Sequence, residues 1–218
     1  MPKNKMPGIL LVGMPYVGKS TIGKKVAELL GFDFFDGDAE IEKVYPDRQK
    51  YLDESGDEKY VEMETDIVAK LPLHNSVLAP GGSVLYSEKA KKCLQPCFKV
   101  YLNASLETIK SRITEIDKRG IVRLRKMGLD NLYAERKGIY QSYMNIELDS
   151  EKNSADEAAV KIVKAYCIRQ LSKNKSGINY ISTNQKSMAG FNDALMLGLA
   201  PDKGLFVPDK FPLFSEDE

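Results

Sequence analysis

The stretch GILLVGMPYVGKST, residues 8–21, joins a short apolar run to a loop that is bounded by glycines and ends in Lys-Ser-Thr. Residues 8–12 form a continuous apolar run of strand length. Behind the loop the apolar residues recur at helical spacing, at Ile22, Val26, Leu29 and Leu30. Gly31 follows in the usual position past a helix end. The order strand, loop, helix and the pattern GxxxxGK(S/T) together predict a loop that binds nucleotide phosphates.

Each residue type in this loop has a physical role in holding phosphate. Glycines let the backbone curl so that amide hydrogens converge on phosphate oxygens, and the helix start adds positive potential. Lys19 would supply a mobile cation for the β- and γ-phosphates, and the Ser20 hydroxyl would ligate Mg²⁺. A glycine turn with a surface lysine is the alternative, and the flanking strand and helix favour the phosphate loop. We therefore expect ATP and Mg²⁺ as cofactors, with the nucleotide bound by Gly13, Val17, Gly18, Lys19, Ser20 and Thr21.

The chain up to about residue 170 alternates strand and helix signals. Further apolar runs predict strands at residues 32–35, 76–79, 98–102 and 144–148. Helical patterns lie between them, including one over residues 129–143 and one that begins at Ser154 with the capping-box partner Glu157. Residues 117–126, DKRGIVRLRK, are basic and carry a glycine, which predicts an exposed mobile loop. The alternation predicts an α/β fold in which helices cover both faces of a parallel sheet.

Composition and charge limit the classes of function. The chain has 218 residues, 43% of them hydrophobic, with 32 basic and 31 acidic residues. This allows one sizeable core and a small appendage, and the balanced charge predicts no attraction to nucleic acid or to an anionic membrane. The first apolar run is too short for a signal segment or a membrane span. Three cysteines form no CxxC pair and one histidine has no second imidazole at metal-ligand spacing, so we expect reduced thiols in a cytoplasmic protein.

Two carboxylates follow the second predicted strand. Asp36 and Asp38 lie two residues apart in FDGDAE, at the strand end where ligands of open α/β sheets collect. On a strand end their side chains would point to the same side of the sheet. Asp38 is a candidate to orient or deprotonate an acceptor hydroxyl, and Asp36 is a candidate to hold Mg²⁺ through water. The alternative for DGD is an ordinary turn.

Several segments in matching order resemble the shikimate kinase family. They are GMPYVGKST, DGDAEIE, APGGS, RGIVRL and LYAERKGIY, within residues 8–170. The resemblance implies a three-layer αβα P-loop kinase fold, with a five-stranded parallel sheet in the order 2-3-1-4-5 and a lid that closes over ATP. It implies that Asp38 contacts the acceptor hydroxyls, that Arg119 in the lid reaches the phosphates and that Arg136 binds the acceptor carboxylate. The backbone of Gly81 and Gly82 would line the acceptor pocket, and the expected catalytic residues are Lys19, Asp38 and Arg119.

Departures from the family pattern lie mostly on the acceptor side. The family usually reads FRxxE, with the arginine as a second clamp on the shikimate carboxylate, whereas this chain reads YVEME over residues 60–64 and has Val61 in that place. The glycine triplet ends in Ser83, Ala79 stands where a small hydroxyl residue is common, and the lid reads RGIV instead of RPLL. Losing one partner of a bidentate carboxylate site costs on the order of a few kcal/mol. Either shikimate binds weakly or the acceptor differs.

The C-terminal part of the chain resembles a second family. From about residue 178 it reads INYISTNQKSMAGFNDALMLGLAPDKGLFVPDKFP, which is similar to the N-terminus of threonine synthase, although Lys203 stands where that family usually has glycine. The preceding polar segment SKNKSG is typical of a linker. We expect a kinase domain over residues 1–171, a linker over 172–177 and the start of a threonine synthase region over 178–218. The chain would then be the front part of a longer fusion, covalently continuous with threonine synthase.

Three functions are compatible with these patterns. Threonine synthase consumes O-phosphohomoserine, so a kinase fused to it would sensibly phosphorylate homoserine, and this acceptor is favoured. The missing arginine would then reflect an acceptor with an ammonium group, paired with Glu58 or Glu62. In the second reading the domain is a shikimate kinase in which Arg136 and the lid compensate for Val61. In the third it is a nucleotide-binding regulatory module without catalysis, against which the intact kinase residues argue.

Overall fold

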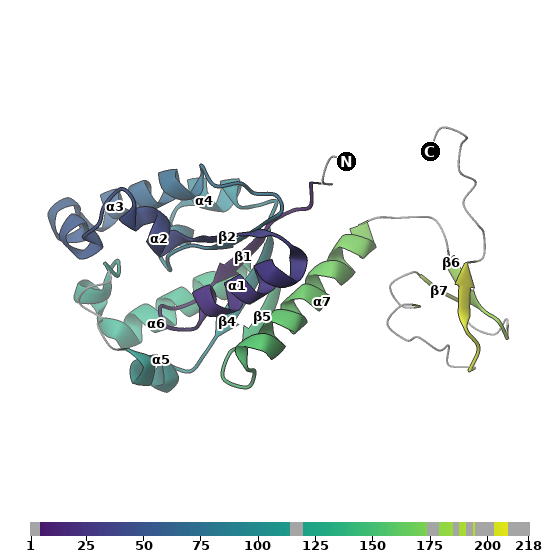
Figure 1. Cartoon of the computed structure of the whole chain (residues 1–218). Helices are drawn as coiled ribbons and strands as arrows, with labels where there is room; N and C mark the ends of the chain where they lie inside the picture. The colour runs from purple at the N-terminus through teal and green to yellow at the C-terminus, as the bar shows by residue number, and fades with distance from the viewer. Residues whose placement is uncertain are drawn as a thin grey trace. The chain divides into compact units, whose positions relative to one another are not determined.

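The computed structural model describes residues 5–113, 120–173, 179–184, 188–190, 194 and 203–208. The chain forms two compact units, residues 1–163 and 164–218. The first unit contains the parallel sheet and the helices that cover it (Figure 1). The domain boundaries expected from the sequence stay a prediction.

Five strands form the sheet of the first unit. In chain order they are β1 Ile9–Val12, β2 Asp33–Asp36, β3 Ser76–Ala79, β4 Phe98–Asn103 and β5 Ile146–Asp149. All neighbouring strands are parallel and their spatial order is β2-β3-β1-β4-β5, which confirms the expected topology. In the central strand Ile9 pairs with Val77 on one side and Phe98 on the other. The strand is uninterruptedly apolar because a parallel strand covered on both faces has no side that meets water.

Helices cover both faces of this sheet. They are α1 Lys19–Leu30, α2 Gly37–Glu42, α3 Arg48–Val68, the 3₁₀ turn η1 Val84–Tyr86, α4 Glu88–Cys93, α5 Leu106–Arg112, α6 Leu124–Tyr143 and α7 Ala155–Lys173. Right-handed connections place α1 on one face, and α3, α4 and α6 on the other. Figure 1 shows α1 in front of the strands and α6 behind them. Lys25 of α1 pairs with Asp156 of α7 at 2.5 Å, so the start of α7 lies beside α1.

Local capping signals in the sequence are confirmed. Gly31 ends α1 with a left-handed φ of 64°. Before α7 the Ser154 amide donates to Glu157 Oε2 at 2.8 Å, and the Glu157 amide donates back to Ser154 Oγ at 3.3 Å. These reciprocal bonds are the capping box that the sequence predicted. A non-helical residue, Gly128 with φ 74° and ψ 163°, interrupts α6, so the long helical segment begins at residue 129 as predicted.

Residues 120–122 of the predicted mobile loop are buried, so the expectation of an exposed segment was wrong there, whereas Arg125 and Lys126 are exposed as expected. Val122 is 1% exposed and belongs to a hydrophobic cluster with Leu52 and Tyr60 of α3. Lys126 Nζ also pairs with Asp57 Oδ2 of α3 at 2.5 Å. The basic composition of this segment concealed an apolar residue, Val122, that packs in a cluster with a distant helix. Arg119, the expected lid residue, lies outside the described residues.

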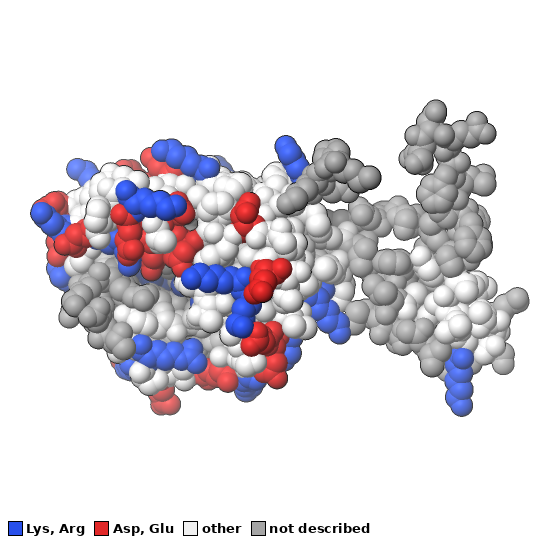
Figure 2. Space-filling model, viewed as in Figure 1, with Lys and Arg blue, Asp and Glu red and all other residues white. Residues whose placement is uncertain are grey.

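The second unit contains a three-stranded antiparallel sheet. Its strands are β6 Asn179–Ser182, β7 Met188–Gly190 and β8 Phe206–Pro208, in the order β7-β6-β8. Within the described ranges, no helix combines the length and the apolar character needed to cross a bilayer. On the face of the first unit drawn in Figure 2, lysine and arginine side chains are interspersed with aspartate and glutamate.

Candidate active site

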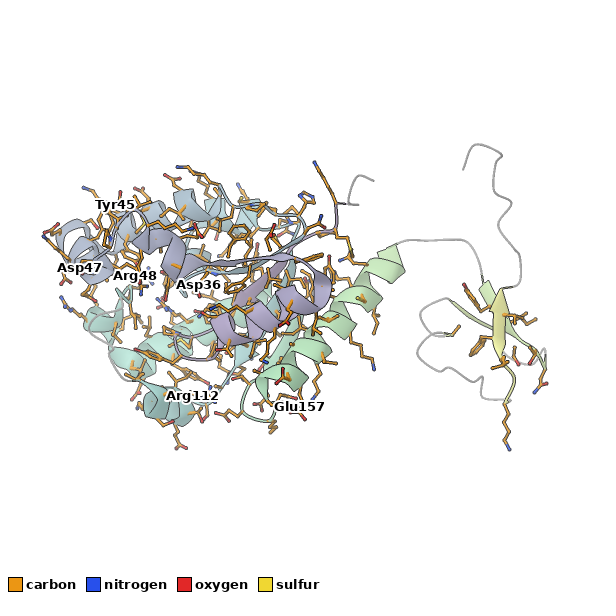
Figure 3. The ribbon with its side chains drawn as sticks, viewed as in Figure 1. Asp36, Tyr45, Asp47, Arg48, Arg112 and Glu157 are labelled. Carbon is orange, nitrogen blue, oxygen red and sulfur yellow. The ribbon has the colours of Figure 1, made fainter. Side chains whose placement is uncertain are left out.

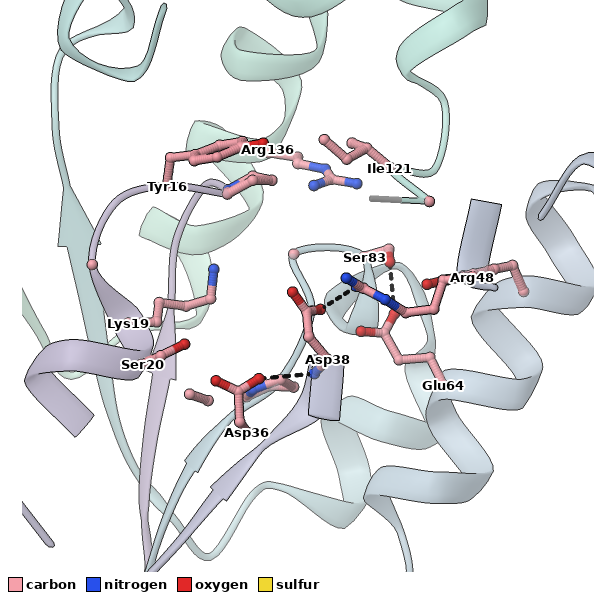
Figure 4. Close-up of a pocket in the computed structure, with 18 of the residues that line it drawn as sticks. Tyr16, Lys19, Ser20, Asp36, Asp38, Arg48, Glu64, Ser83, Ile121 and Arg136 are labelled. Atoms are coloured by element: carbon pink, nitrogen blue, oxygen red, sulfur yellow. Dashed lines mark hydrogen bonds and ion pairs between the residues drawn. The ribbon is translucent and has the colours of Figure 1, made fainter. Parts of the chain in front are cut away.

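A pocket of about 290 Å³ lies at the carboxyl ends of the strands, where the segments after β1, β2 and β3 meet. Residues from the predicted phosphate loop and from the predicted acceptor site line this same pocket. The predicted residues that line it are Gly18, Lys19, Ser20, Thr21, Asp36, Asp38, Gly81, Gly82 and Arg136. Figure 4 shows Lys19 and Ser20 on one side and Arg48, Glu64 and Ser83 on the other, with Asp38 between them.

The loop between β1 and α1 has the conformation that phosphate binding needs. Gly18 precedes α1 with φ 102°, and neither a side-chain cap nor an acidic residue occupies the first turn of this helix. The first amides of α1 are therefore available to an anion. At Gly13, φ is 152° and a Cβ would lie 2.5 Å from the Leu102 carbonyl oxygen. Gly13 and the buried Val17 thus support the loop and do not line the pocket.

Lys19 is bent back onto its own loop. Its ammonium donates to the carbonyl oxygens of Gly13 at 2.9 Å and Met14 at 3.1 Å. Burial lowers the pKa of Lys19 to about 8, although the Asp38 carboxylate opposes this shift. A phosphate placed on the loop would give this ammonium charged acceptors in place of neutral carbonyls, and charged acceptors form stronger hydrogen bonds.

Asp36 and Asp38 both line the pocket, as expected, but the local structure that places Asp38 there is a helix start and not a strand end. The strand β2 ends at Asp36 and α2 begins at Gly37, so Asp38 lies in the first turn of a helix and not on a strand end. Asp36 caps that helix, because its Oδ1 accepts hydrogen bonds from the amides of Asp38 at 3.0 Å and Ala39 at 3.4 Å. The cap fixes the backbone of Asp38 beside the phosphate loop.

The expected Mg²⁺ site is compatible with the oxygen atoms that the pocket offers. Ser20 contributes a hydroxyl and Asp36 a carboxylate, and both line the pocket beside Lys19. Across the described ranges, no group of three or more histidine, cysteine, aspartate or glutamate residues is arranged to hold a metal ion. Mg²⁺ typically keeps several waters and shares its coordination with substrate phosphates, so two protein oxygens fit it.

Arg136 is the deepest cation on the acceptor side. It is 2% exposed, its Nη2 donates to the Val122 carbonyl at 3.1 Å and its Nε to the Tyr86 hydroxyl at 3.4 Å. Burial opposes its charge, but the neighbouring Tyr140 and Tyr86 outweigh burial and raise the pKa of the guanidinium. It therefore presents a permanent positive charge to the pocket, as a carboxylate-binding residue must.

A second buried arginine, Arg48, lines the same pocket and was not predicted from the sequence. It begins α3 directly after Asp47, where Figure 3 labels it, and Figure 4 shows its guanidinium directed at Asp38. Arg48 is 9% exposed, and its Nη1 pairs with Asp38 Oδ1 at 2.8 Å. An arginine that follows a helix cap in a charged segment is expected on the surface. No local signal in the sequence could therefore have identified Arg48 as a pocket residue.

Glu64 also lines the pocket and was not predicted from the sequence. It contacts Ser83, one of the residues that depart from the family pattern. This carboxyl group is 1% exposed, and its Oε2 accepts a hydrogen bond from the Ser83 hydroxyl at 2.6 Å. Among the described residues its Oε1 has no hydrogen-bond partner. Burial raises the pKa of Glu64 to about 7, against the opposing hydrogen bond from Ser83. The serine in place of the third family glycine thus supplies a donor for a buried carboxyl group.

Val61, the position of the missing family arginine, lies outside this pocket. It is partly buried and packs against the cluster of Ile41, Leu52, Tyr60, Met63 and Val122. It borders a separate, smaller hollow together with Tyr86 and Arg123. The expected loss of one carboxylate-binding arginine stays a prediction, because the second arginine of the pocket, Arg48, pairs with Asp38.

Stability should fall as pH rises through the range in which Glu64 ionises. Its folded-state pKa of about 7 exceeds the ordinary value of 4.5, so between these pH values the folded protein holds a proton that the unfolded chain releases. The wild-type protein should lose on the order of 1–3 kcal/mol of its free energy of unfolding between pH 5 and pH 8 because of this group. Glu64→Gln keeps the side chain neutral at both pH values, so this loss should be absent in the variant. Urea unfolding at both pH values measures this difference. The exposed Glu62→Gln is the control, and an equal pH loss in wild type and Glu64→Gln would contradict the assignment.

Gly82→Ala should impair acceptor binding without affecting the nucleotide. A Cβ at this position would lie 2.5 Å from Arg136 Nη1 and 2.8 Å from the Tyr140 hydroxyl, so the guanidinium must move. We expect KM for the acceptor to rise by about 10-fold while KM for ATP stays within about 2-fold, since only one substrate loses a contact. Steady-state kinetics with each substrate varied measures both. Gly138→Ala, where a Cβ meets no atom within 4 Å, is the matched control.

The arrangement suits phosphoryl transfer to a hydroxyl of an anionic small molecule. One side of the pocket has open helix amides and a lysine, which bind phosphate. The other side has the buried Arg136, whose planar guanidinium group suits a carboxylate, and Arg48, which pairs with Asp38. Asp38 lies between them, where an acceptor hydroxyl has to meet the transferred phosphate.

Comparison with known proteins gives two family matches. The shikimate kinase family model matches residues 15–167, and the model for the threonine synthase N terminus matches residues 179–218. The chain is 33% identical over 162 residues to a shikimate kinase of Bacillus licheniformis, covering 72% of this chain and 91% of that protein. It is 32% identical over 167 residues to a shikimate kinase of Thermobifida fusca, covering 72% and 94%.

Solved structures give the same fold. A shikimate kinase from Acinetobacter baumannii in complex with shikimate superposes with a TM-score of 0.67 at 26% identity, covering 78% of this chain and 96% of that chain. A shikimate kinase from Aquifex aeolicus superposes with a TM-score of 0.64 at 21% identity, covering 75% and 98%. The sheet order found in the first unit is thus that of a P-loop kinase fold.

Proposed function

Because this chain belongs to the shikimate kinase family of small-molecule kinases, we propose that it transfers the γ-phosphate of ATP to a hydroxyl of shikimate. The observation that carries the proposal is the pocket that Lys19, Asp38 and Arg136 share. Shikimate offers a carboxylate for a buried arginine and hydroxyls for Asp38.

In the proposed reaction the acceptor oxygen attacks the γ-phosphorus, the bond from this phosphorus to its bridging oxygen breaks, and ADP leaves. Asp38 orients the acceptor hydroxyl and accepts its proton. Lys19 stabilises the negative charge on the β- and γ-phosphates, and Arg136 binds the acceptor carboxylate. Mg²⁺ held by Ser20, and through water by Asp36, would neutralise phosphate charge when the nucleotide is bound. The role expected of Arg119, contact with the phosphates, stays a prediction.

The acceptor is tested by ADP release with ATP and Mg²⁺ and, in parallel reactions, shikimate, homoserine or gluconate. We expect turnover with shikimate and none above background with the other two. Product analysis by phosphorus NMR should show a new phosphomonoester in the shikimate reaction. Turnover confined to homoserine or gluconate would overturn the shikimate assignment, and absence of turnover with every acceptor would favour a regulatory nucleotide-binding module.

Homoserine is the second candidate acceptor, and one observation favours it. Residues 179–218 match the N terminus of threonine synthase, an enzyme that consumes O-phosphohomoserine. The curated relatives of the first unit are shikimate kinases, so the comparisons support shikimate more than the homoserine that the sequence alone favoured. The carboxylates expected to pair with an ammonium group, Glu58 and Glu62, do not line the kinase pocket.

The C-terminal match leads to a proposal about the protein as a whole. We propose that residues 178–218 begin a threonine synthase region to which the kinase unit is covalently joined. The support is the family match over residues 179–218. Sequencing of the full transcript tests this, and a stop codon directly after residue 218 would contradict it.

A further inference from the structure

The buried position of the Arg48 guanidinium is unfavourable for the stability of the fold unless the side chain has a role in the pocket. Its guanidinium is 9% exposed although it carries a full charge, and burying a charge is unfavourable unless its partners are well placed. The start of α3 does not need it, because the Asp47 side chain caps this helix by accepting from the Lys50 amide at 2.9 Å. A well-packed apolar residue would serve the fold as well or better.

The partners of Arg48 tie it to the acceptor side of the pocket. Nη1 pairs with Asp38 Oδ1 at 2.8 Å, and Nε pairs with Glu42 Oε1 at 3.1 Å. Tyr60 adds a side-chain hydrogen bond. The guanidinium is therefore held from several directions, by groups of α2 and α3, and this leaves it little freedom to turn. A cation fixed in this way imposes its own orientation on the carboxylate that it contacts.

Asp38 is thereby held at both its main chain and its side chain. Asp36 Oδ1 accepts a hydrogen bond from the Asp38 amide at 3.0 Å, which fixes the backbone. Arg48 bonds Oδ1 of the side chain, and the Asp38 side chain, 37% exposed, still borders the pocket. A catalytic carboxylate commonly has such a partner, because a flexible acceptor of a proton is in the reactive orientation for only part of the time.

We propose that Arg48 is a positioning residue for phosphoryl transfer, which orients the Asp38 carboxylate toward the acceptor hydroxyl. This inference rests on the proposed kinase function. It differs from a carboxylate-binding role, which falls to Arg136, because Arg48 acts through Asp38 and not on the acceptor directly. Its loss should therefore lower kcat and leave substrate binding nearly unchanged.

Steady-state kinetics of Arg48→Gln and Arg48→Lys with ATP and shikimate tests the proposal. We expect kcat to fall about 10- to 100-fold in Arg48→Gln, with both KM values within about 3-fold, since a small misplacement of a catalytic group has an effect of this order. Arg48→Lys should recover part of kcat because it restores the charge. Glu42→Gln, which removes the other carboxylate partner of Arg48, should lower kcat by a smaller factor. Unchanged kcat in Arg48→Gln, or a rise in KM for shikimate at constant kcat, would overturn the proposal.

The matched control is Arg125→Gln. Arg125 also forms an arginine–aspartate pair, with Asp53 at 2.6 Å, but it does not line the kinase pocket. Its loss should leave kcat within about 2-fold of wild type, since exposed ion pairs contribute little. Thermal melting of each variant reports whether it is folded.

A crystal structure of Arg48→Gln gives a readout that does not depend on turnover. We expect the Asp38 carboxylate to adopt a different side-chain rotamer or to become disordered, while its amide keeps the bond to Asp36. An unchanged Asp38 carboxylate would overturn the positioning role even if the protein phosphorylates shikimate. If the wild-type protein is inactive with every acceptor, the proposed function is overturned. The crystal structure of Arg48→Gln would still decide whether Arg48 orients the Asp38 carboxylate.

Discussion

Replacing Lys19 with alanine is expected to lower kcat by about 100- to 1000-fold or more. Its ammonium is the one charged group of the described phosphate loop, and it lies in a partly buried position where an electrostatic contact is stronger than in water. Its present partners are two carbonyl oxygens, which a phosphate can replace. ADP release under saturating ATP and shikimate measures the loss.

The control for this substitution is Lys24→Ala on the same helix. Lys24 is exposed and does not line the pocket, so its removal should change kcat by less than about 2-fold. Thermal melting should show that Lys19→Ala is folded, since a partly buried lysine that bonds only neutral carbonyl oxygens adds little stability. Near-normal turnover in Lys19→Ala would mean that the nucleotide binds elsewhere.

Asp38→Asn should lower kcat by on the order of 100- to 10,000-fold, because the amide cannot accept the proton of the acceptor hydroxyl. The substitution keeps the shape of the side chain and its hydrogen-bond acceptor toward Arg48. Binding of ATP, measured by calorimetry with a non-hydrolysable analogue, should therefore stay within about 3-fold of wild type. The pair of measurements separates a loss of chemistry from a loss of nucleotide binding.

The matched control for Asp38→Asn is Asp66→Asn. Asp66 also pairs with a basic residue, Lys89 at 2.7 Å, but on the exposed surface of α3. It should leave kcat unchanged. Turnover of Asp38→Asn above about a tenth of the wild-type rate would show that Asp38 does not take the proton, and the mechanism would then need another base.

The nucleotide half of the site could be predicted from the sequence because it is built from contiguous residues. Residues 13–21 by themselves contain the glycines, the lysine and the start of the helix, and the structure places Gly18, Lys19 and Ser20 as that pattern requires. The strand order followed from the family resemblance, and the strands themselves from continuous apolar runs. The capping box of Ser154 and Glu157 was equally local.

The acceptor half was only partly predictable because its residues come from elements far apart in the chain. Asp38 was a candidate from its place after the second strand and Arg136 was known only through the resemblance, and their shared pocket confirms that they lie together. Arg48 and Glu64 were missed, and emphasis fell on Val61, which lies outside the pocket. A charged residue on a helix is exposed in most proteins, so the sequence gives no reason to place it inside.

The sequence by itself determined the fold class, the phosphate loop and the strand ends at which the pocket forms. These depend on spacing within a few residues, where backbone geometry leaves few alternatives. Only the tertiary structure decided which charges face the acceptor and what holds them, including the pair of Arg48 with Asp38 and the bond of Ser83 to Glu64. The physical reason is that a buried charge is stable only with a partner in contact, and such partners are brought together by packing of distant segments.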